Sequence, residues 1–171
     1  DSDGGFEDCT ELLGDSLIAF VGNAPATSWS KMCAVTLDLS GNVYNYFKSW
    51  HYAGGANNVE ATSDGGFIVA GGYSNFGGIG ELNKFNDWGY YEWTNRYFSM
   101  GESSYYSYSY ISTVLPTDDG GYIVAGSSPL FSNEWHKSKS MLMKLDHNGK
   151  SNTASGITPQ VSPTNNFCAG G

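Results

Sequence analysis

Histidine is the first residue to consider for catalysis, because an imidazole beside a hydroxyl or thiol can activate a nucleophile. The chain has three histidines, His51, His136 and His147. Their spacing indicates no Ser-His-Asp or Cys-His arrangement, and the Gly-x-Ser-x-Gly motif does not occur in the sequence. His147 falls inside a predicted hairpin turn, where a solvated side chain is the simplest interpretation. The sequence therefore predicts no acyl-transfer activity, and we expect the protein not to be an enzyme.

Carboxylate and amide oxygens, which are the ligands that Ca²⁺ prefers, come close together at three places. These pairs are Asp1 with Asp3, Asp118 with Asp119, and Asp146 with Asn148. The last pair begins like a calcium-binding loop but lacks the distal acidic ligand. A turn in which the side chain accepts nearby backbone N–H groups is the favoured interpretation. We therefore expect no cofactor, and Ca²⁺ is the only candidate.

The three cysteines, Cys9, Cys33 and Cys168, are too far apart for a zinc site or a redox Cys-x-x-Cys motif. An odd number allows at most one intramolecular disulfide. One interpretation has all three thiols buried as small apolar side chains. The other is a disulfide between Cys9 and Cys168, which would tie the two ends of the chain together.

Aromatic side chains supply the candidate ligand-binding residues. The segment SSYYSYSY alternates Ser and Tyr, so a strand there would place Tyr106, Tyr108 and Tyr110 on one face. Trp88 and Trp135 fall in or beside predicted turns. An exposed row of aromatic rings can stack on sugar rings or on another subunit, whereas a buried row is ordinary core. These five residues could therefore bind glycans or a second copy of the chain.

A repeated unit must position these residues. Residues 62–72 read TSDGGFIVAGG and residues 117–127 read TDDGGYIVAGS. In both, an Asp-Gly-Gly corner precedes an aromatic residue and an Ile-Val pair, which predicts a tight turn leading into a buried strand. A degenerate copy, LIAFVG at residues 17–22, lies 50 positions before FIVAGG.

A second motif repeats out of phase with the first. It reads VTLDLSGNV at 35–43, KFNDWGYY at 84–91 and MKLDHNGKS at 143–151. Each copy ends a strand with Leu or Phe, then has Asp or Asn, two further residues and a glycine. This spacing predicts a hairpin turn in which Gly41, Gly89 and Gly149 have positive φ.

The two motifs together predict one all-β domain over residues 1–171, built from repeats at about 1–56, 57–107 and 108–160 and a partial repeat at 161–171. The best copy predicts strands at 57–62, 67–72, 80–85 and 90–98. The next predicts strands at 108–117, 122–127 and 140–145, and a weak strand after Lys150.

The run from the threonine before Asp-Gly-Gly to the Leu-Asp-x-Asn-Gly hairpin resembles the repeat of secreted, mostly bacterial β-propeller proteins. The resemblance covers residues 57–150 well and 16–50 loosely. It implies a propeller-like array of about three four-stranded antiparallel blades plus a partial fourth. The corners are also similar to the Asp-box of sialidase-like propellers, which is a structural turn. In this sequence LIAFVG lacks the Asp-Gly-Gly corner, and Trp88 stands where asparagine is usual.

Three repeats are fewer than the roughly four to eight blades that close a propeller. One alternative is a threefold fold similar to a β-trefoil. Otherwise the chain continues beyond these residues, or neighbouring copies supply the missing strands. A head-to-tail contact between copies need not close, so it would produce a homo-oligomer or a filament.

The amino-acid composition limits the classes of molecule that the protein is expected to bind. The chain has 17 acidic and 8 basic residues, a net charge of -9 and no basic cluster, so nucleic acid is an unfavourable partner. No apolar run approaches the roughly 20 residues that span a membrane. The low charged fraction and the many Gly and Tyr residues suggest a secreted or cell-surface protein.

The leading functional hypothesis is an extracellular structural protein, a non-enzymatic and self-assembling subunit of a fibre or surface layer. A carbohydrate-binding or adhesion β-propeller module is the first alternative. A fragment of a larger propeller glycosidase is the second.

Overall fold

The computed structural model describes residues 4–12, 14, 16–25, 31–49, 54–73, 79–98, 110–128 and 139–151. Within these residues the chain consists of strands, turns and connecting segments and contains no helix. The strands form three antiparallel sheets, and in each sheet the strands follow one another in chain order. The prediction of an all-β fold is confirmed.

The first sheet contains β1 (Gly5–Glu11), β2 (Leu17–Ala24), β3 (Lys31–Asp38) and β4 (Val43–Lys48). The second contains β5 (Gly55–Ala61), β6 (Phe67–Tyr73), β7 (Ile79–Phe85) and β8 (Tyr91–Phe98). The third contains β9 (Tyr110–Pro116), β10 (Tyr122–Ser128) and β11 (Lys139–Leu145). The first and third sheets lie within the predicted repeats 1–56 and 108–160, whereas the second sheet begins at Gly55, two residues before the predicted boundary at 57.

The seven strands predicted for the second and third repeats are confirmed, each with bounds within two residues of the observed ones. Of the weak strand predicted after Lys150, the structure describes a single antiparallel bridge between Leu145 and Ser151. The predicted partial repeat at 161–171 lies outside the described residues.

The alignment of LIAFVG with FIVAGG at a spacing of 50 is wrong by one residue. A Cβ on Gly22 would lie 2.0 Å from the Gly5 carbonyl oxygen, and a Cβ on Gly71 would lie 2.0 Å from the Gly55 carbonyl oxygen. Gly22 therefore matches Gly71, and the spacing is 49. Since neighbouring residues of a strand point to opposite faces, this difference decides which residues of β2 face the second sheet.

Both predicted turn motifs have glycine in the left-handed region. In the hairpins, φ is 83° at Gly41, 73° at Gly89 and 69° at Gly149. In the Asp-Gly-Gly corners, φ is 89° at Gly65 and 77° at Gly120. Glycine adopts this conformation without a Cβ clash, which explains why the residue recurs at these positions.

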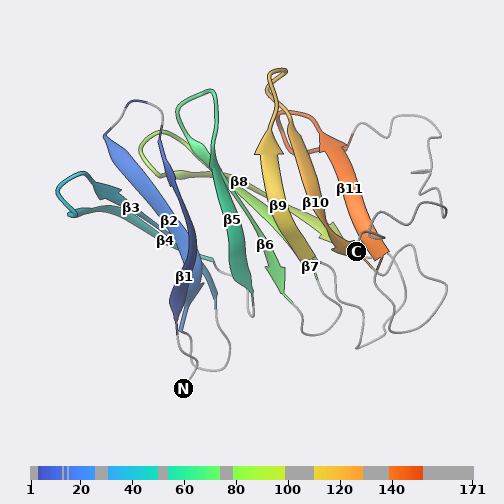
Figure 1. The fold of residues 1–171 in the computed structure, drawn as a ribbon, viewed down its shortest axis with the longest axis horizontal. Coiled ribbons are helices and arrows are strands. Elements are labelled where there is room, and N and C mark those ends of the chain that lie inside the picture. The colour runs from blue at the N-terminus through green and yellow to red at the C-terminus, as the bar shows by residue number, and fades with distance from the viewer. Residues whose placement is uncertain are drawn as a thin grey trace, which may run out of the picture.

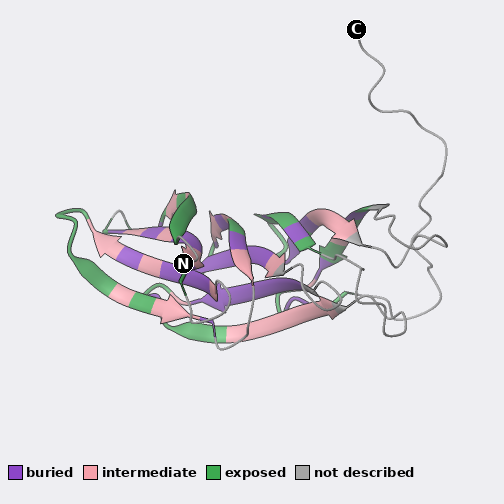
Figure 2. Cartoon of the chain, turned by 90° about the horizontal axis from the view of Figure 1, so that it is seen from below, coloured by how far each residue is buried: buried purple, intermediate pink, exposed green. Residues whose placement is uncertain are grey.

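The three sheets stack face to face, with β1, β5 and β9 following one another along one side of the array (Figure 1). Buried residues gather where neighbouring sheets meet (Figure 2). Between the first and second sheets the core includes Val21, Met32, Phe67 and Phe85. Between the second and third sheets it includes Ile68, Leu82, Ile111, Val124 and Leu145. The same kind of interface therefore occurs twice in the chain.

Candidate interaction site

The first strands of consecutive sheets are joined by one polar side chain each. Asp8 Oδ2 in β1 accepts hydrogen bonds from the Val59 backbone N–H (2.9 Å) and from Asn58 Nδ2 (2.9 Å) in β5. Asn58 Oδ1 accepts hydrogen bonds from the Val114 N–H (2.8 Å) and from the Thr113 hydroxyl (3.2 Å) in β9. Asp8 and Asn58 therefore hold the backbone of the next sheet in the same way.

Strand pairing shows that these residues share one position of the repeat. Asp8 lies opposite Val21, Asn58 opposite Ala70, and Thr113 opposite Ala125, in each case next to a β-bulge. The bulge turns the side chain away from the regular alternation of the strand. Thr113 is therefore the third member of the series and lies in the third of the described sheets.

We call the face of a sheet that is turned toward the next sheet its trailing face, and the opposite face its leading face. On the trailing face of the second sheet, Ile68, Ala70 and Leu82 are all 0% exposed, because the third sheet covers them. The matching positions of the first sheet are Ala19, Val21 and Ala34, which are also buried. Internal trailing faces are thus fully covered.

The trailing face of the third sheet has the same pattern and is open. Ile123 matches Ile68, because Ile123 pairs with Lys144 as Ile68 pairs with Lys84. Leu142 matches Leu82, because each pairs with an alanine two residues further along the second strand of its sheet. Leu142 is 72% exposed where Leu82 is 0% exposed, and Leu115 beside Ile123 is also exposed. Water-exposed aliphatic side chains that gather on one sheet face are typical of an interaction surface.

The leading face of the first sheet is the open face at the other end of the array. It carries Cys9, Phe20, Val35 and Tyr46 in one cross-strand row. Cys9 and Tyr46 are exposed, and Phe20 and Val35 are half-buried. The positions in the second and third sheets that match Cys9 are Val59 and Val114, which are both buried. Both open faces therefore show exposed residues at positions that are buried inside the array.

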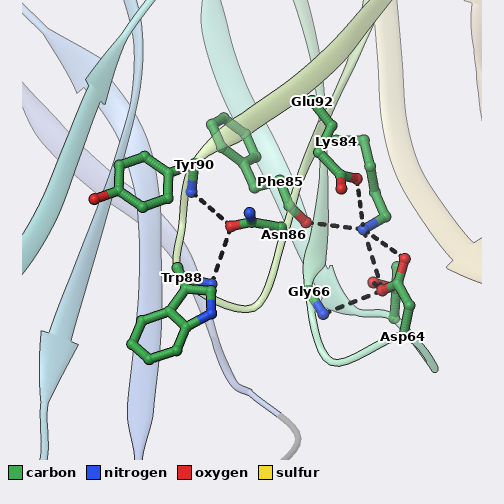
Figure 3. A network of polar contacts seen from close by, with 9 residues as sticks. Asp64, Gly66, Lys84, Phe85, Asn86, Trp88, Tyr90 and Glu92 are labelled. Atoms are coloured by element: carbon green, nitrogen blue, oxygen red, sulfur yellow. Dashed lines mark hydrogen bonds and ion pairs between the residues drawn. The ribbon is translucent and has the colours of Figure 1, made fainter.

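A lysine at the same position of the second and third sheets differs in exposure. Lys84 Nζ lies 2.9 Å from Asp64 Oδ2 and donates to the Phe85 carbonyl oxygen (2.8 Å), and Glu92 lies at 3.4 Å (Figure 3). In the third sheet, Lys144 Nζ lies 2.7 Å from Asp119 Oδ1. The Lys84 side chain is 3% exposed, whereas that of Lys144 is 48% exposed.

These contacts change the acidity of both aspartates. Burial raises the pKa of the Asp64 carboxyl, but hydrogen bonds from the Thr62 hydroxyl, from Lys84 and from a backbone N–H outweigh it, so the pKa lies below its ordinary value. Hydrogen bonding by Lys144 holds the pKa of Asp119 well below its ordinary value. Both carboxylates are therefore ionised at neutral pH and fix the Asp-Gly-Gly corner.

At the outer side of the array, the hairpin turns of the second and third sheets each contact the fourth strand of the preceding sheet. Asn45 Nδ2 in β4 donates to the Trp88 carbonyl oxygen (3.4 Å). Asn95 Nδ2 in β8 donates to the Asn148 carbonyl oxygen, and the Tyr97 hydroxyl donates to the Gly149 carbonyl oxygen. The sheets are thus joined at both sides of an apolar core.

The first interface also contains a buried polar group of residues. Asn83 Nδ2 donates to Glu81 Oε1 (3.0 Å), and Asn83 Oδ1 accepts from the Thr94 hydroxyl. Glu81 Oε2 lies 3.1 Å from Arg96 Nε. Burial raises the pKa of Glu81. Because Met32 Sδ of the first sheet accepts a further hydrogen bond from Asn83, this group helps to fix the register between the sheets.

The predicted aromatic residues fall in different places. Trp88 lies in the turn between β7 and β8, where it is half-exposed and 6.0 Å from the Tyr44 ring, measured between centroids. The backbone N–H of Trp88 donates a hydrogen bond to Asn86 Oδ1 (3.0 Å; Figure 3). Tyr110 is exposed in β9. Tyr106, Tyr108 and Trp135 lie outside the described residues, so the structure does not place the predicted tyrosine row.

Two of the three cysteines are described, and their surroundings differ. Cys9 is an exposed free thiol in β1, and Cys33 is a buried free thiol in β3. Burial raises the pKa of the Cys33 thiol. The interpretation that all three cysteines are buried is therefore wrong for Cys9. Cys168, its predicted disulfide partner, lies outside the described residues.

The oxygen-rich turns act as local caps. Asp146 Oδ1 accepts hydrogen bonds from the backbone N–H groups of Asn148 (2.9 Å) and Lys150 (2.8 Å), and these bonds lower the pKa of Asp146. Asp119 is paired with Lys144, as described above. Among the residues that the structure describes, no group of three or more His, Cys, Asp and Glu side chains could hold a metal ion. The interpretation as a side-chain-capped turn is confirmed for Asp146 and for Asp119, whose Oδ1 accepts the Gly121 backbone N–H (3.1 Å). Asp1 and Asp3 lie outside the described residues.

Apart from Cys9, sequence reasoning missed the residues of the two open faces. Leu115, Ile123 and Leu142 belong to strands that were predicted correctly, but an alternating strand has the same pattern whether or not its face is covered. The signal that could have found them is the comparison of Ile123 and Leu142 with Ile68 and Leu82, position by position.

No known protein family matches the chain, and a search of curated proteins found no match. Within the described part of the chain, no helix is long and apolar enough to cross a membrane.

Proposed function

We propose that this chain is a non-enzymatic extracellular structural protein that assembles with copies of itself into a fibre or surface layer. The observation that carries the proposal is the exposure of Ile123 and Leu142 at positions where Ile68 and Leu82 are fully buried. Covering aliphatic surface contributes roughly 25 cal/mol for each Å² removed from water. An exposed copy of an internal interface is therefore a surface on which a further sheet gains stability.

The array is propeller-like, with each sheet as one blade. This proposal is supported by the chain-order pairing of strands within each sheet and by the succession of β1, β5 and β9 along one side (Figure 1). Each described sheet takes its strands from one continuous stretch of the chain, which favours blades over the trefoil-like alternative. Three blades leave both end faces open, and closure or extension then depends on further sheets.

Secretion to the cell exterior fits the composition. The chain carries a net charge of -9, and only 15% of its residues are charged. A net negative charge keeps separate copies soluble, and its repulsion weakens with salt. Assembly through the apolar end faces is therefore expected to strengthen as ionic strength rises.

Light scattering after size-exclusion chromatography, together with electron microscopy, tests self-assembly. The expected result is a mass that grows with protein concentration, with ordered oligomers or filaments in the micrographs. A compact monomer of 18.4 kDa at all concentrations would contradict the proposal.

A second candidate function is glycan binding at the Tyr44–Trp88 pair. The two half-exposed rings come from different sheets and lie 6.0 Å apart at a tilt of 34°. Aromatic faces with polar edges are suited to stacking on sugar rings. A glycan array tests this candidate: binding should be lost in Trp88→Ala and in Tyr44→Ala and kept in Tyr110→Ala. No binding by the unaltered chain would remove it.

A further inference from the structure

The two open faces of the array correspond in position to the two sides of the internal interface. Inside the chain, a trailing face packs on a leading face twice, first between the first and second sheets and then between the second and third. The third sheet ends with a free trailing face, and the first sheet begins with a free leading face. A second copy of the chain brings the leading face that the trailing face of the first copy lacks.

We infer that the trailing face of one copy docks on the leading face of a second copy, in the register that joins consecutive sheets inside the chain. This inference rests on the proposed function and specifies its contact. The contact is heterologous, so the two copies use different surfaces. A two-fold symmetric contact would instead pair one face with itself.

The internal contacts define the register. Asn58 lies in the trailing row with Ala70 and Leu82, and its side chain accepts a hydrogen bond from the Val114 N–H of the next leading face. On the open faces, Thr113 occupies the position of Asn58, and Cys9 occupies the position of Val114. The same register therefore places Thr113 of one copy opposite Cys9 of the other. The Leu142 row then faces the row that contains Phe20 and Val35.

The apolar residues of the two rows complement each other. Leu142 is 72% exposed and projects from the third strand of its sheet. Phe20 and Val35 are half-buried in β2 and β3 of the opposite row and leave their outer sides to solvent. In the neighbouring rows, Ile123 of the trailing face comes opposite Ile18 of the leading face. Aliphatic and aromatic side chains are therefore covered on both sides.

The backbone N–H groups of the first strands, β1, β5 and β9, support the same register. The Val59 and Val114 N–H groups are held by a side chain of the preceding sheet. No sheet precedes the matching Cys9 N–H among the described residues, and this group is held by Asp8 Oδ1 of its own strand (2.9 Å). The Thr113 hydroxyl, at the position of Asp8 and Asn58, supplies an acceptor for the Cys9 N–H when a second copy docks.

A thiol pair tests this register. We would introduce Thr113→Cys into chains that carry Cys168→Ser and oxidise them with glutathione disulfide, which accepts the two electrons of the new bond. The expected product is a disulfide between position 113 of one chain and Cys9 of another, seen as dimers or ladders that reduction reverses. The matched controls are Cys9→Ser in the same background, and Ser40→Cys in an exposed turn in place of Thr113→Cys. Neither should form this product.

A mixing experiment tests the direction of the contact. Leu142→Asp and Phe20→Asp should each weaken self-association by about tenfold or more, since each introduces a carboxylate into one of the two faces. Mixing the two variants should restore a one-to-one complex, because each retains the face that the other needs. Circular dichroism and thermal melting would verify that both variants fold, and the thiol test does not depend on them.

Three results would overturn the inference. One is persistent self-association with no disulfide between position 113 and Cys9, which would leave the proposed function standing with another contact surface. The second is a disulfide between these positions within one chain, which would mean that the chain closes on itself. The third is a monomer at all concentrations, which would remove both the inference and the proposed function.

Discussion

Lys84 and Lys144 occupy the same position in consecutive sheets, yet their side chains are 3% and 48% exposed. Each ammonium group pairs with the aspartate of its own Asp-Gly-Gly corner. Lys84 also lies 3.4 Å from Glu92 of β8 in its own sheet, and its strand neighbour Ile68 packs against the third sheet. Lys144 has neither of these neighbours among the described residues, which agrees with its greater exposure.

This difference predicts unequal effects of the same substitution. Lys84→Met removes the buried partner of the Phe85 carbonyl oxygen, and we expect the free energy of unfolding to fall by about 1 to 3 kcal/mol. Lys144→Met removes a half-exposed ion pair and should change the stability little. Urea unfolding of both variants measures this. Equal losses would show that burial of the lysine is not the deciding factor.

The hydrogen bond from the Val114 N–H to Asn58 joins β5 to β9, and its contribution to stability can be measured. Asn58→Ala leaves the Val114 N–H without its acceptor, and we expect a loss of about 1 to 3 kcal/mol in the free energy of unfolding. Thr113→Ala, at the same position of the last sheet, is the matched control and should cost much less. Hydrogen exchange should also show faster exchange of the Val114 N–H in Asn58→Ala. Unchanged exchange at Val114 would contradict the assigned role.

The Asp64 carboxylate predicts a loss of stability in acid. Its pKa in the folded chain lies below the ordinary value of 3.8, so the unfolded chain binds more protons at low pH. The stabilisation is therefore complete above the unfolded pKa and is lost as the pH falls through the folded pKa. Asp64→Asn should be less stable than the unaltered chain at pH 7, and the difference should shrink toward pH 2. Unfolding curves at several pH values measure it, and a constant difference would count against it.

Much of the fold could be predicted because the repeat carries its own signals. The Asp-Gly-Gly corners and the Asp-x-x-Gly hairpins specify turns with positive φ, and the strands between them follow. The error in aligning LIAFVG arose because the first repeat lacks the corner, so the alignment relied on the final glycine alone. Gly22 is identified only by its close approach to the Gly5 carbonyl oxygen, which is a contact between strands.

The candidate site could be predicted less well, because it depends on what covers a surface. Aromatic residues were chosen for their chemistry, and of these Trp88 and Tyr110 are exposed. The exposed residues of the open trailing face are ordinary Leu and Ile, which local sequence assigns to the core. Their exposure follows only from the number and order of the sheets.

Gly71 lies so close to the neighbouring strand β5 that a larger residue at this position is expected to destabilise the second sheet. A Cβ on Gly71 would lie 2.0 Å from the Gly55 carbonyl oxygen and 2.6 Å from Met32 Cε, so Gly71→Ala would have to displace the backbone of β5. We expect a loss of about 2 to 4 kcal/mol in the free energy of unfolding. Gly5→Ala is the matched control, because no atom lies within 4 Å of its added Cβ. Denaturant unfolding of both variants checks the prediction, and a stable Gly71→Ala would mean that β5 and β6 are not paired at this distance.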